Sequence, residues 1–198
     1  MIIKCYNEKH QYLLFIDLEF NNRDLVQFAG LLFTWIDDDT YQLMRSCNVY
    51  ISQKVCYPFA EYTSITNNFL EENGVPITDA KELIKEFLDG VDLDDMSVIG
   101  HGLKNDRLVL VENGIEFTHK TNGQPIDGYC TFNNAKRILD RANHLTLADL
   151  AEECGYYLHA AHNAYNDVWA EVAVFSYLKK VEAQKGEKVW VLQLVLVS

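Results

Sequence analysis

The sequence contains no long hydrophobic run, and no segment approaches the ~20 consecutive apolar residues that a membrane-spanning helix needs. Its first residues, MIIKCYNEKHQYLLFIDLEF, also lack the charged start, apolar stretch and small-residue cleavage site of a signal peptide. With 48% hydrophobic and 23% charged residues, the composition is typical of a globular protein. We therefore expect neither a membrane protein nor a secreted one.

Cysteine is too scarce and too scattered for a disulfide framework. The chain has five cysteines, an odd number, and no C-x-x-C pair. They lie at Cys5, Cys47, Cys56, Cys130 and Cys154. This pattern predicts reduced thiols in a cytoplasmic protein and argues against a structural zinc site.

Positive charge is in deficit, with 17 lysines and arginines against 29 acidic residues and a net charge of −12. Proteins that bind long nucleic acids usually present a basic face to the phosphates, so a long duplex is a poor candidate substrate. The deficit does not exclude a nuclease, because carboxylates that bind metal ions add to the acidic total and a short single strand carries few phosphates.

The length of the chain predicts a single domain over residues 1–198. Its first part reads as an antiparallel meander, with strands over 11–18, 25–36 and 43–51 and with the DDDT sequence at 37–40 as a turn. Strands then alternate with helices, which indicates an α/β domain with a mixed central sheet.

The chain after Pro76 is expected to contain several helices and one short buried strand. Apolar residues recur at helical spacing after Pro76, with Thr78 as the expected N-cap and Gly90 beyond the end. A buried strand over 96–99 precedes a helix that ends at Gly114, and further helices are expected over 131–141, 146–154 and 164–180. Thr146 and Asp149 have the spacing of a capping box.

The C-terminal sequence KVWVLQLVLVS, residues 188–198, is rich in strand-forming residues. It is therefore expected to form an apolar strand. Such a strand would aggregate if left open, so it should be covered. Addition to the sheet is favoured, and covering by a second copy in a homodimer is the alternative.

Two acids interrupt an apolar strand in the sequence FIDLEF. Asp17 and Glu19 are two residues apart, so both side chains project to the same face, within ~7 Å of each other. At an effective dielectric constant of ~20, like charges ~5 Å apart repel by about 3 kcal/mol, and burial adds to this cost. Either a cation or protonation must offset it, unless the pair simply faces solvent at a strand end.

Three further residues fit the same pocket. Asp106 follows the short buried strand in GHGLKNDRLVL, although a helix N-cap is an alternative role, and His162 and Asp167 begin the last helix in HNAYND. Positions five apart on a helix differ by ~140° around its axis. His162 should therefore lie in the lead-in loop or first turn, bent toward the pocket that Asp167 enters.

These motifs resemble those of the DnaQ-like (DEDDh) 3'-5' exonuclease family, which includes ribonuclease T, oligoribonuclease and the proofreading subunits of bacterial replicases. Its D-x-E motif matches Asp17 and Glu19, its H-x4-D motif matches His101 to Asp106, and its H-x-A-x-x-D motif matches His162 to Asp167. The resemblance covers most of residues 12–180 and implies a ribonuclease H-like fold, a mixed β-sheet flanked by α-helices.

The chain also departs from the family pattern. Gly102 stands where asparagine is usual, and residues 20–22 replace threonines that often follow the first motif. Asn163 occupies the position that would hold tyrosine in the tyrosine variant of the family. The sequence therefore matches the histidine class.

The resemblance implies a metal-dependent 3'-5' exonuclease that hydrolyses single-stranded RNA or DNA to nucleoside 5'-monophosphates. By this resemblance, Asp17 bridges two divalent cations, Mg²⁺ or Mn²⁺, Glu19 and Asp167 help to hold one, and Asp106 acts on the other. His162 is the expected general base. Substrate contacts are expected from Phe20, Leu18 and His101.

Two alternatives remain open at this point. One is a module of the same fold that binds nucleic-acid ends or a protein without cleavage. The other is a proofreading or processing subunit that is active only within a larger complex.

Overall fold

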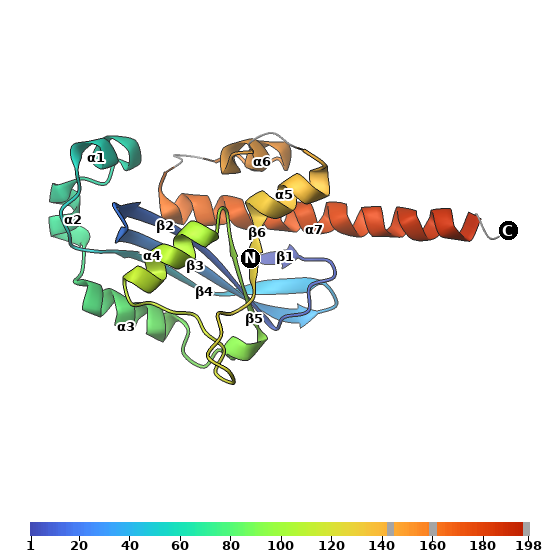
Figure 1. Cartoon of the computed structure of the whole chain (residues 1–198), viewed down its shortest axis with the longest axis horizontal. Coiled ribbons are helices and arrows are strands. Elements are labelled where there is room, and N and C mark those ends of the chain that lie inside the picture. Colours follow the sequence, from blue (N-terminus) through green and yellow to red (C-terminus); the bar gives the residue numbers. More distant parts are fainter. Residues whose placement is uncertain (142–144, 159–161, 196–198) are drawn as a thin grey trace.

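In the computed structural model, residues 1–141, 145–158 and 162–195 are described, with the backbone alone for 187–195. A six-stranded sheet in the order β1-β4-β3-β2-β5-β6 forms the centre (Figure 1). The strands are β1 (Ile2–Lys4), β2 (Tyr12–Asn21), β3 (Asp24–Asp37), β4 (Thr40–Tyr50), β5 (Met96–Gly100) and β6 (Gly128–Cys130). β1 to β4 pair antiparallel, whereas β5 pairs parallel with both β2 and β6, so the predicted mixed sheet is confirmed.

The antiparallel meander of β2, β3 and β4 is confirmed, and local backbone chemistry explains its turns. Asn22 and Arg23 connect β2 to β3 with φ angles of 52° and 80°. Two consecutive residues with positive φ match the twist of the flanking strands, and asparagine tolerates this conformation well. The DDDT segment forms the predicted turn between β3 and β4.

Seven α-helices are described. They are α1 (Tyr57–Thr63), α2 (Asn67–Asn73), α3 (Ile77–Phe87), α4 (Lys104–Glu112), α5 (Thr131–Leu139), α6 (Leu147–Glu153) and α7 (Ala164–Val195). The capping box of Thr146 and Asp149 is present at α6, as predicted. The expected N-cap of α3 is wrong, because the helix begins at Ile77 with Pro76 as its N-cap. Proline lacks a backbone N–H and disrupts a helix interior, so the helix begins directly after Pro76.

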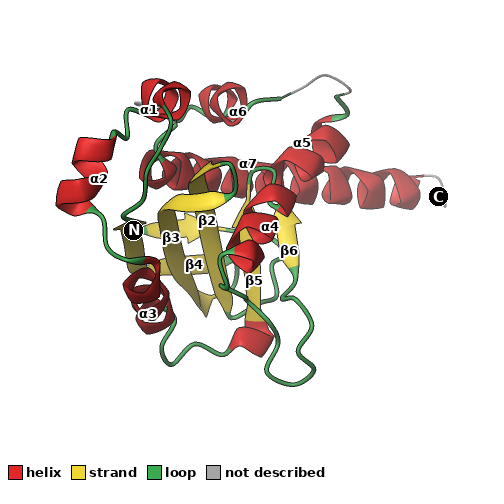
Figure 2. Ribbon diagram, turned by 60° about the vertical axis from the view of Figure 1, so that its left-hand side comes forward, coloured by secondary structure: helices red, strands yellow, loops and turns green. Residues whose placement is uncertain are grey.

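The two faces of the sheet carry separate apolar cores. Leu14, Ile16 and Leu18 of β2 pack in a cluster that includes residues of α3 and α4. Leu13 and Phe15 point to the opposite face, where Phe15 meets Phe175 of α7 edge to face at 5.3 Å. Figure 2 shows α4 and α7 on opposite sides of the sheet. Because successive side chains of β2 point to opposite faces, its odd-numbered residues, including Asp17 and Glu19, point toward α7.

The remaining helices, α1, α2, α5 and α6, pack outside the two main cores. α5 and α6 pack against the middle of α7 through a third cluster, which includes Ala135, Leu150 and Val174. α1 and α2 cover a smaller cluster around Val26 and Leu70. Among the described residues, no helix has the length and apolarity to cross a bilayer.

The predicted C-terminal strand over 188–198 is wrong, because α7 continues through this segment to Val195. The stretch before it, LKKVEAQKGE over residues 178–187, consists largely of strong helix formers and contains no proline, and Gly186 is its one poor helix former. A helix that is already formed gains one backbone hydrogen bond for each added residue, whereas a new strand needs a partner edge. The last turns of α7 extend beyond the sheet (Figure 1), and residues 196–198 lie outside the described part of the chain.

A buried ion pair attaches α7 to the loop before β2. Lys179 Nζ lies 2.9 Å from Glu8 Oε2, with the two side chains 9% and 10% exposed, and His10 Nδ1 lies 2.7 Å from Glu8 Oε1. Removal of one partner from a buried pair leaves an uncompensated charge. This contact therefore helps to hold α7 in place on the sheet.

We expect Lys179→Met to lower the free energy of unfolding by about 3 kcal/mol, the lower end of the range for buried pairs, because His10 remains beside Glu8. Urea unfolding at pH 7 measures the change. Lys180→Met, at the exposed neighbouring position, is the matched control. The double variant Glu8→Gln/Lys179→Met should recover most of the loss, and a loss below about 1 kcal/mol in the single variant would contradict this account.

Candidate active site

Three carboxylates meet between the end of β2 and the first turn of α7. One oxygen each of Asp17, Glu19 and Asp167 lies within 4.8 Å of the other two. Asp17 and Glu19 share one face of β2, and Asp167 reaches them from the helix that covers this face. The fold thus brings together residues that lie 150 positions apart in the sequence.

Asp106 lies in the first turn of α4 and is only 6% exposed. Desolvation is the main cause of the raised pKa of Asp17 and of Glu19, and the charge of Asp106 adds to both shifts, so Asp106 lies near the same cluster. The alternative role as a helix N-cap does not hold, since the N-cap of α4 is Leu103. Asp106 is therefore the fourth acid at this end of the sheet.

His162 precedes α7 in a left-handed backbone conformation with φ of 67°. Its backbone N–H donates to Asp167 Oδ2 at 3.0 Å, which folds the lead-in segment back over the first turn of the helix. As the spacing predicted, His162 and Asp167 line the same pocket despite their separation of five residues. The pocket has a volume of about 630 Å³.

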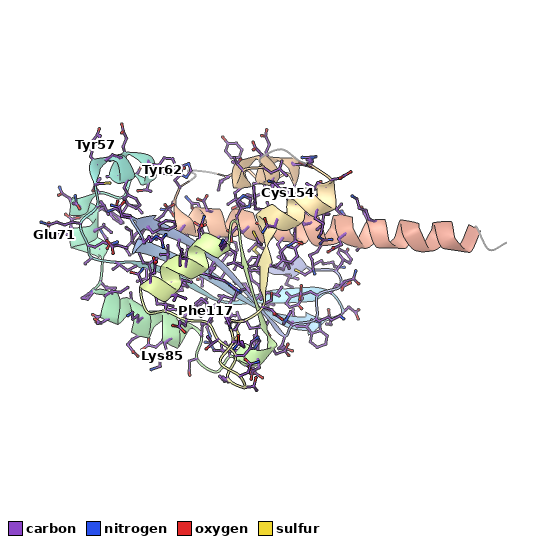
Figure 3. All side chains as sticks on the ribbon, in the orientation of Figure 1. Tyr57, Tyr62, Glu71, Lys85, Phe117 and Cys154 are labelled. Atoms are coloured by element: carbon purple, nitrogen blue, oxygen red, sulfur yellow. The ribbon has the colours of Figure 1, made fainter. Side chains whose placement is uncertain are left out.

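An aromatic ring from a distant part of the chain covers His162. Tyr62 of α1 places its ring centroid 3.8 Å from that of His162, with the two planes inclined by 33°. In Figure 3, Tyr62 lies on the side of α1 that is nearer to α6, whereas Tyr57 points away from the body. Tyr62 therefore forms one wall of the pocket.

A buried polar residue fixes the start of α7 on the sheet. Gln27 of β3, opposite Glu19 in the strand register, accepts a hydrogen bond from the Ala164 N–H at 3.2 Å through its Oε1. Its Nε2 donates to Asn48 Oδ1 at 2.9 Å. The sequence analysis missed Gln27, although a glutamine within the apolar run LVQFAGLLF was the available signal.

His101 lies in the turn between β5 and α4, and hydrogen bonds hold both its backbone and its ring. Its backbone N–H donates to Glu171 Oε1 at 2.7 Å, and its ring Nδ1 lies 3.0 Å from Thr131 Oγ1. His101 lines the pocket, and its expected contact with substrate stays a prediction. Glu171 was also missed; its spacing of four residues after Asp167, on the same face of the helix, was the available signal.

The other two expected substrate contacts lie elsewhere. Leu18 is 5% exposed and belongs to the core on the face of the sheet opposite the acids. Phe20 packs against the same core. Neither is among the described residues that line the pocket, so their contact with substrate stays a prediction.

Burial and mutual repulsion disfavour the charged forms of the acids. Desolvation, and then the charges of Asp167 and Asp106, raise the pKa of Glu19 to about 7. Desolvation raises the pKa of Asp106 to about 7 and that of Asp167 to about 6, although backbone hydrogen bonds partly oppose it at Asp167. Desolvation also lowers the pKa of His162, which favours its neutral form.

The cluster fits a hard divalent cation. All its donors are carboxylate oxygens, the ligands that Mg²⁺ and similar ions prefer. Within the described residues, Asp167 Oδ1 and Glu171 Oε2 are buried without a hydrogen-bond partner. A cation would satisfy such oxygens and also offset the repulsion among the acids.

Searches found no matching protein-family model and no matching curated protein. Solved structures do match. E. coli exonuclease I in complex with a dT13 oligonucleotide aligns with a TM-score of 0.67 and 15% identity, over 91% of this chain and 43% of that chain. Its zinc-bound form in complex with single-stranded DNA aligns similarly, with a TM-score of 0.66.

Two shorter proteins match over most of their own length. Exonuclease X, in complex with 5' overhanging duplex DNA, aligns with a TM-score of 0.60 and 17% identity, over 86% of this chain and 93% of that chain. A 3'-exonuclease that recognises the histone mRNA stem-loop aligns with a TM-score of 0.64 and 9% identity, over 88% of this chain and 84% of that chain.

These similarities establish the fold. The chain has the ribonuclease H-like α/β fold of these exonucleases, as the sequence predicted. It spans less than half the length of the exonuclease I structures. At identities of 9% to 17%, the similarity extends to the fold alone.

The raised carboxyl pKa values lead to a testable dependence of stability on pH. With raised pKa values for Glu19, Asp106 and Asp167, the folded protein binds more protons than the unfolded chain between pH 5 and 7. Their contribution to stability is therefore present at low pH and is lost as the pH rises through 6 to 7. The lowered pKa of His162 opposes this trend, but with a single group.

In EDTA, we expect the free energy of unfolding to fall by at least about 2 kcal/mol between pH 5 and pH 8, which corresponds to a melting temperature lower by at least about 4 °C. Thermal unfolding monitored by circular dichroism measures it. Asp17→Asn should reduce the slope, because it removes one of the repelling charges. A melting temperature that is constant or rises over this range would contradict the account of the cluster.

Proposed function

We propose that this chain is a metal-dependent 3'-5' exonuclease that removes nucleotides from single-stranded RNA or DNA and releases nucleoside 5'-monophosphates. The observation that carries the proposal is the meeting of Asp17, Glu19 and Asp167 within 4.8 Å, at a pocket that His162 also lines. The shared fold with nucleic-acid exonucleases supports the same reaction class.

Asp17, Glu19 and Asp167 would hold one divalent cation, Mg²⁺ or Mn²⁺, and Asp106 would act on a second one that the family resemblance implies. When bound, such ions orient the attacking and leaving oxygens of a phosphodiester and stabilise the charge that develops on them. Bound ions would relieve the repulsion among the carboxylates of the cluster.

His162 would act as the general base. Its lowered pKa keeps the imidazole neutral near pH 7, so that it can take a proton from the attacking water. The hydrogen bond from its backbone to Asp167 and the stacking of Tyr62 hold the residue in one place. The proton acceptor is thus fixed relative to the carboxylates.

The other residues of the pocket suit exposed bases. Tyr62, Phe132, Leu147 and Leu158 supply aromatic and apolar surface around the acids. Unpaired bases stack on such side chains with little regard to sequence. Single-stranded ends fit this surface better than a long duplex does, because the net charge of −12 repels an extended row of phosphates.

The central experiment follows cleavage of 5'-labelled single-stranded DNA and RNA oligonucleotides with Mg²⁺. We expect a ladder that shortens from the 3' end, and complete loss of turnover in EDTA with recovery on addition of Mg²⁺. Turnover that persists in excess EDTA would contradict the metal-dependent mechanism. Bound oligonucleotide without cleavage would favour a binding module or a subunit that requires a larger complex.

Substitution of the base provides a separate prediction. His162→Ala should reduce the rate constant by about 10²–10⁴-fold, the usual contribution of a positioned general base. His119→Ala is the matched control, because His119 pairs with Asp94 and is not among the residues that line the pocket. Equal rates for His162→Ala and the wild-type protein would exclude His162 as the base.

Tyr62 offers a prediction about binding. We expect Tyr62→Ala to raise the KM for short oligonucleotides by about tenfold, consistent with the loss of one stacked base. Tyr57→Ala on the same helix is the control, since Tyr57 is 76% exposed and Figure 3 places it away from the pocket. If both variants gave the same KM, Tyr62 would have no role in substrate binding.

A further inference from the structure

Glu171 is a buried acid that the three family motifs do not include. It lies on α7 one turn after Asp167, and its exposed fraction is 0%. Side chains four residues apart on a helix lie on the same face. Glu171 therefore faces the sheet from the same side of α7 as Asp167.

The two carboxylate oxygens of Glu171 have different surroundings. Oε1 accepts the hydrogen bond from the backbone N–H of His101 at 2.7 Å, which connects α7 to the turn between β5 and α4. Oε2 is buried and has no hydrogen-bond partner within the described part of the chain. An unsatisfied buried polar atom is costly, so it calls for a partner.

Glu171 lies beside the acid cluster. After desolvation, the groups that raise the pKa of Glu171 are Asp17, Asp106 and Asp167, all members of the acid cluster. Asp167 also has a free buried oxygen, Oδ1. Two adjacent turns of α7 thus each present an unpartnered oxygen to the same group of acids.

A purely structural role does not account for this arrangement. To connect α7 to His101 requires one neutral acceptor, which a glutamine would supply without adding a negative charge. A fifth carboxylate beside four others instead increases the repulsion within the cluster. A divalent cation is the partner that would use both the charge and the free oxygen.

We propose that Glu171 is a fifth acid of the cation site, which holds the β5–α4 turn through one oxygen and accepts a hydrogen bond from the hydration shell of the bound cation through the other. This inference rests on the proposed function, because it assigns Glu171 to the same site. Glu171 is a positioning residue for the cation, and the ligands remain Asp17, Glu19, Asp106 and Asp167.

The test measures Mn²⁺ binding directly, by isothermal titration calorimetry on the full chain without substrate. Glu171→Gln keeps the acceptor for His101 and the volume of the side chain but removes the charge. We expect its affinity for Mn²⁺ to fall by at least about tenfold, as for other residues that support metal ligands. Glu182→Gln, the same change on the same helix beside Arg137, should leave the affinity unchanged.

A second comparison separates charge from packing. Glu171→Asp keeps the charge and should bind Mn²⁺ more tightly than Glu171→Gln does. The rise in melting temperature that a fixed excess of Mn²⁺ produces should also be smaller in Glu171→Gln than in the wild-type protein, because the stabilisation by a ligand grows with the logarithm of its affinity. A merely structural residue would lower the melting temperature without changing this difference.

The outcomes distinguish this inference from the proposed function. Wild-type affinity in Glu171→Gln, or equal affinities in the Gln and Asp variants, would overturn the role of Glu171 while the exonuclease proposal stands. No Mn²⁺ binding by the wild-type protein would overturn both.

Discussion

The position of α7 relative to the end of β2 is the constraint on which the site depends. Asp167 can meet Asp17 and Glu19 only while the first turn of this helix is held against the sheet, although the carboxylates repel one another. Polar contacts hold it there: Gln27 binds the Ala164 N–H, and Glu171 binds the His101 N–H. The apolar contact between Phe15 and Phe175 and the ion pair between Glu8 and Lys179 secure the following turns. The rigid core thus supplies the free energy that keeps like charges together.

This arrangement couples folding to protonation and, under the proposed function, to cation binding. Without cations, burial and repulsion raise the carboxyl pKa values, so protons would compete with metal ions for the same oxygens. The protonated, charged and proposed cation-bound forms of the acid cluster therefore contribute differently to the free energy of unfolding. Functional sites commonly carry such local strain, which the rest of the structure compensates.

Local patterns in the sequence predicted most of this architecture. Alternation placed Asp17 and Glu19 on one face, and the spacing of His162 and Asp167 required the bend before α7 that the structure shows. Gln27 and Glu171 were missed because their partners, Ala164 and His101, lie on distant elements that the local pattern does not reveal. The C-terminal segment was assigned to a strand on local propensity, which the continuing helix overrides. Leu18 and Phe20 pack in or against the core on the other face of β2, so the structure adds no support to their expected contact with substrate, which stays a prediction.

The left-handed backbone at His162 narrows the choice of amino acids at this position. Among residues other than glycine, asparagine, aspartate and histidine adopt positive φ most readily, and of these three only histidine has an imidazole. Most replacements would thus disturb the turn and remove the ring in a single step. Asparagine would tolerate the turn without an imidazole, so it isolates the chemistry of the ring from the shape of the chain. Side-chain reactivity and main-chain geometry together would leave this position little freedom to vary.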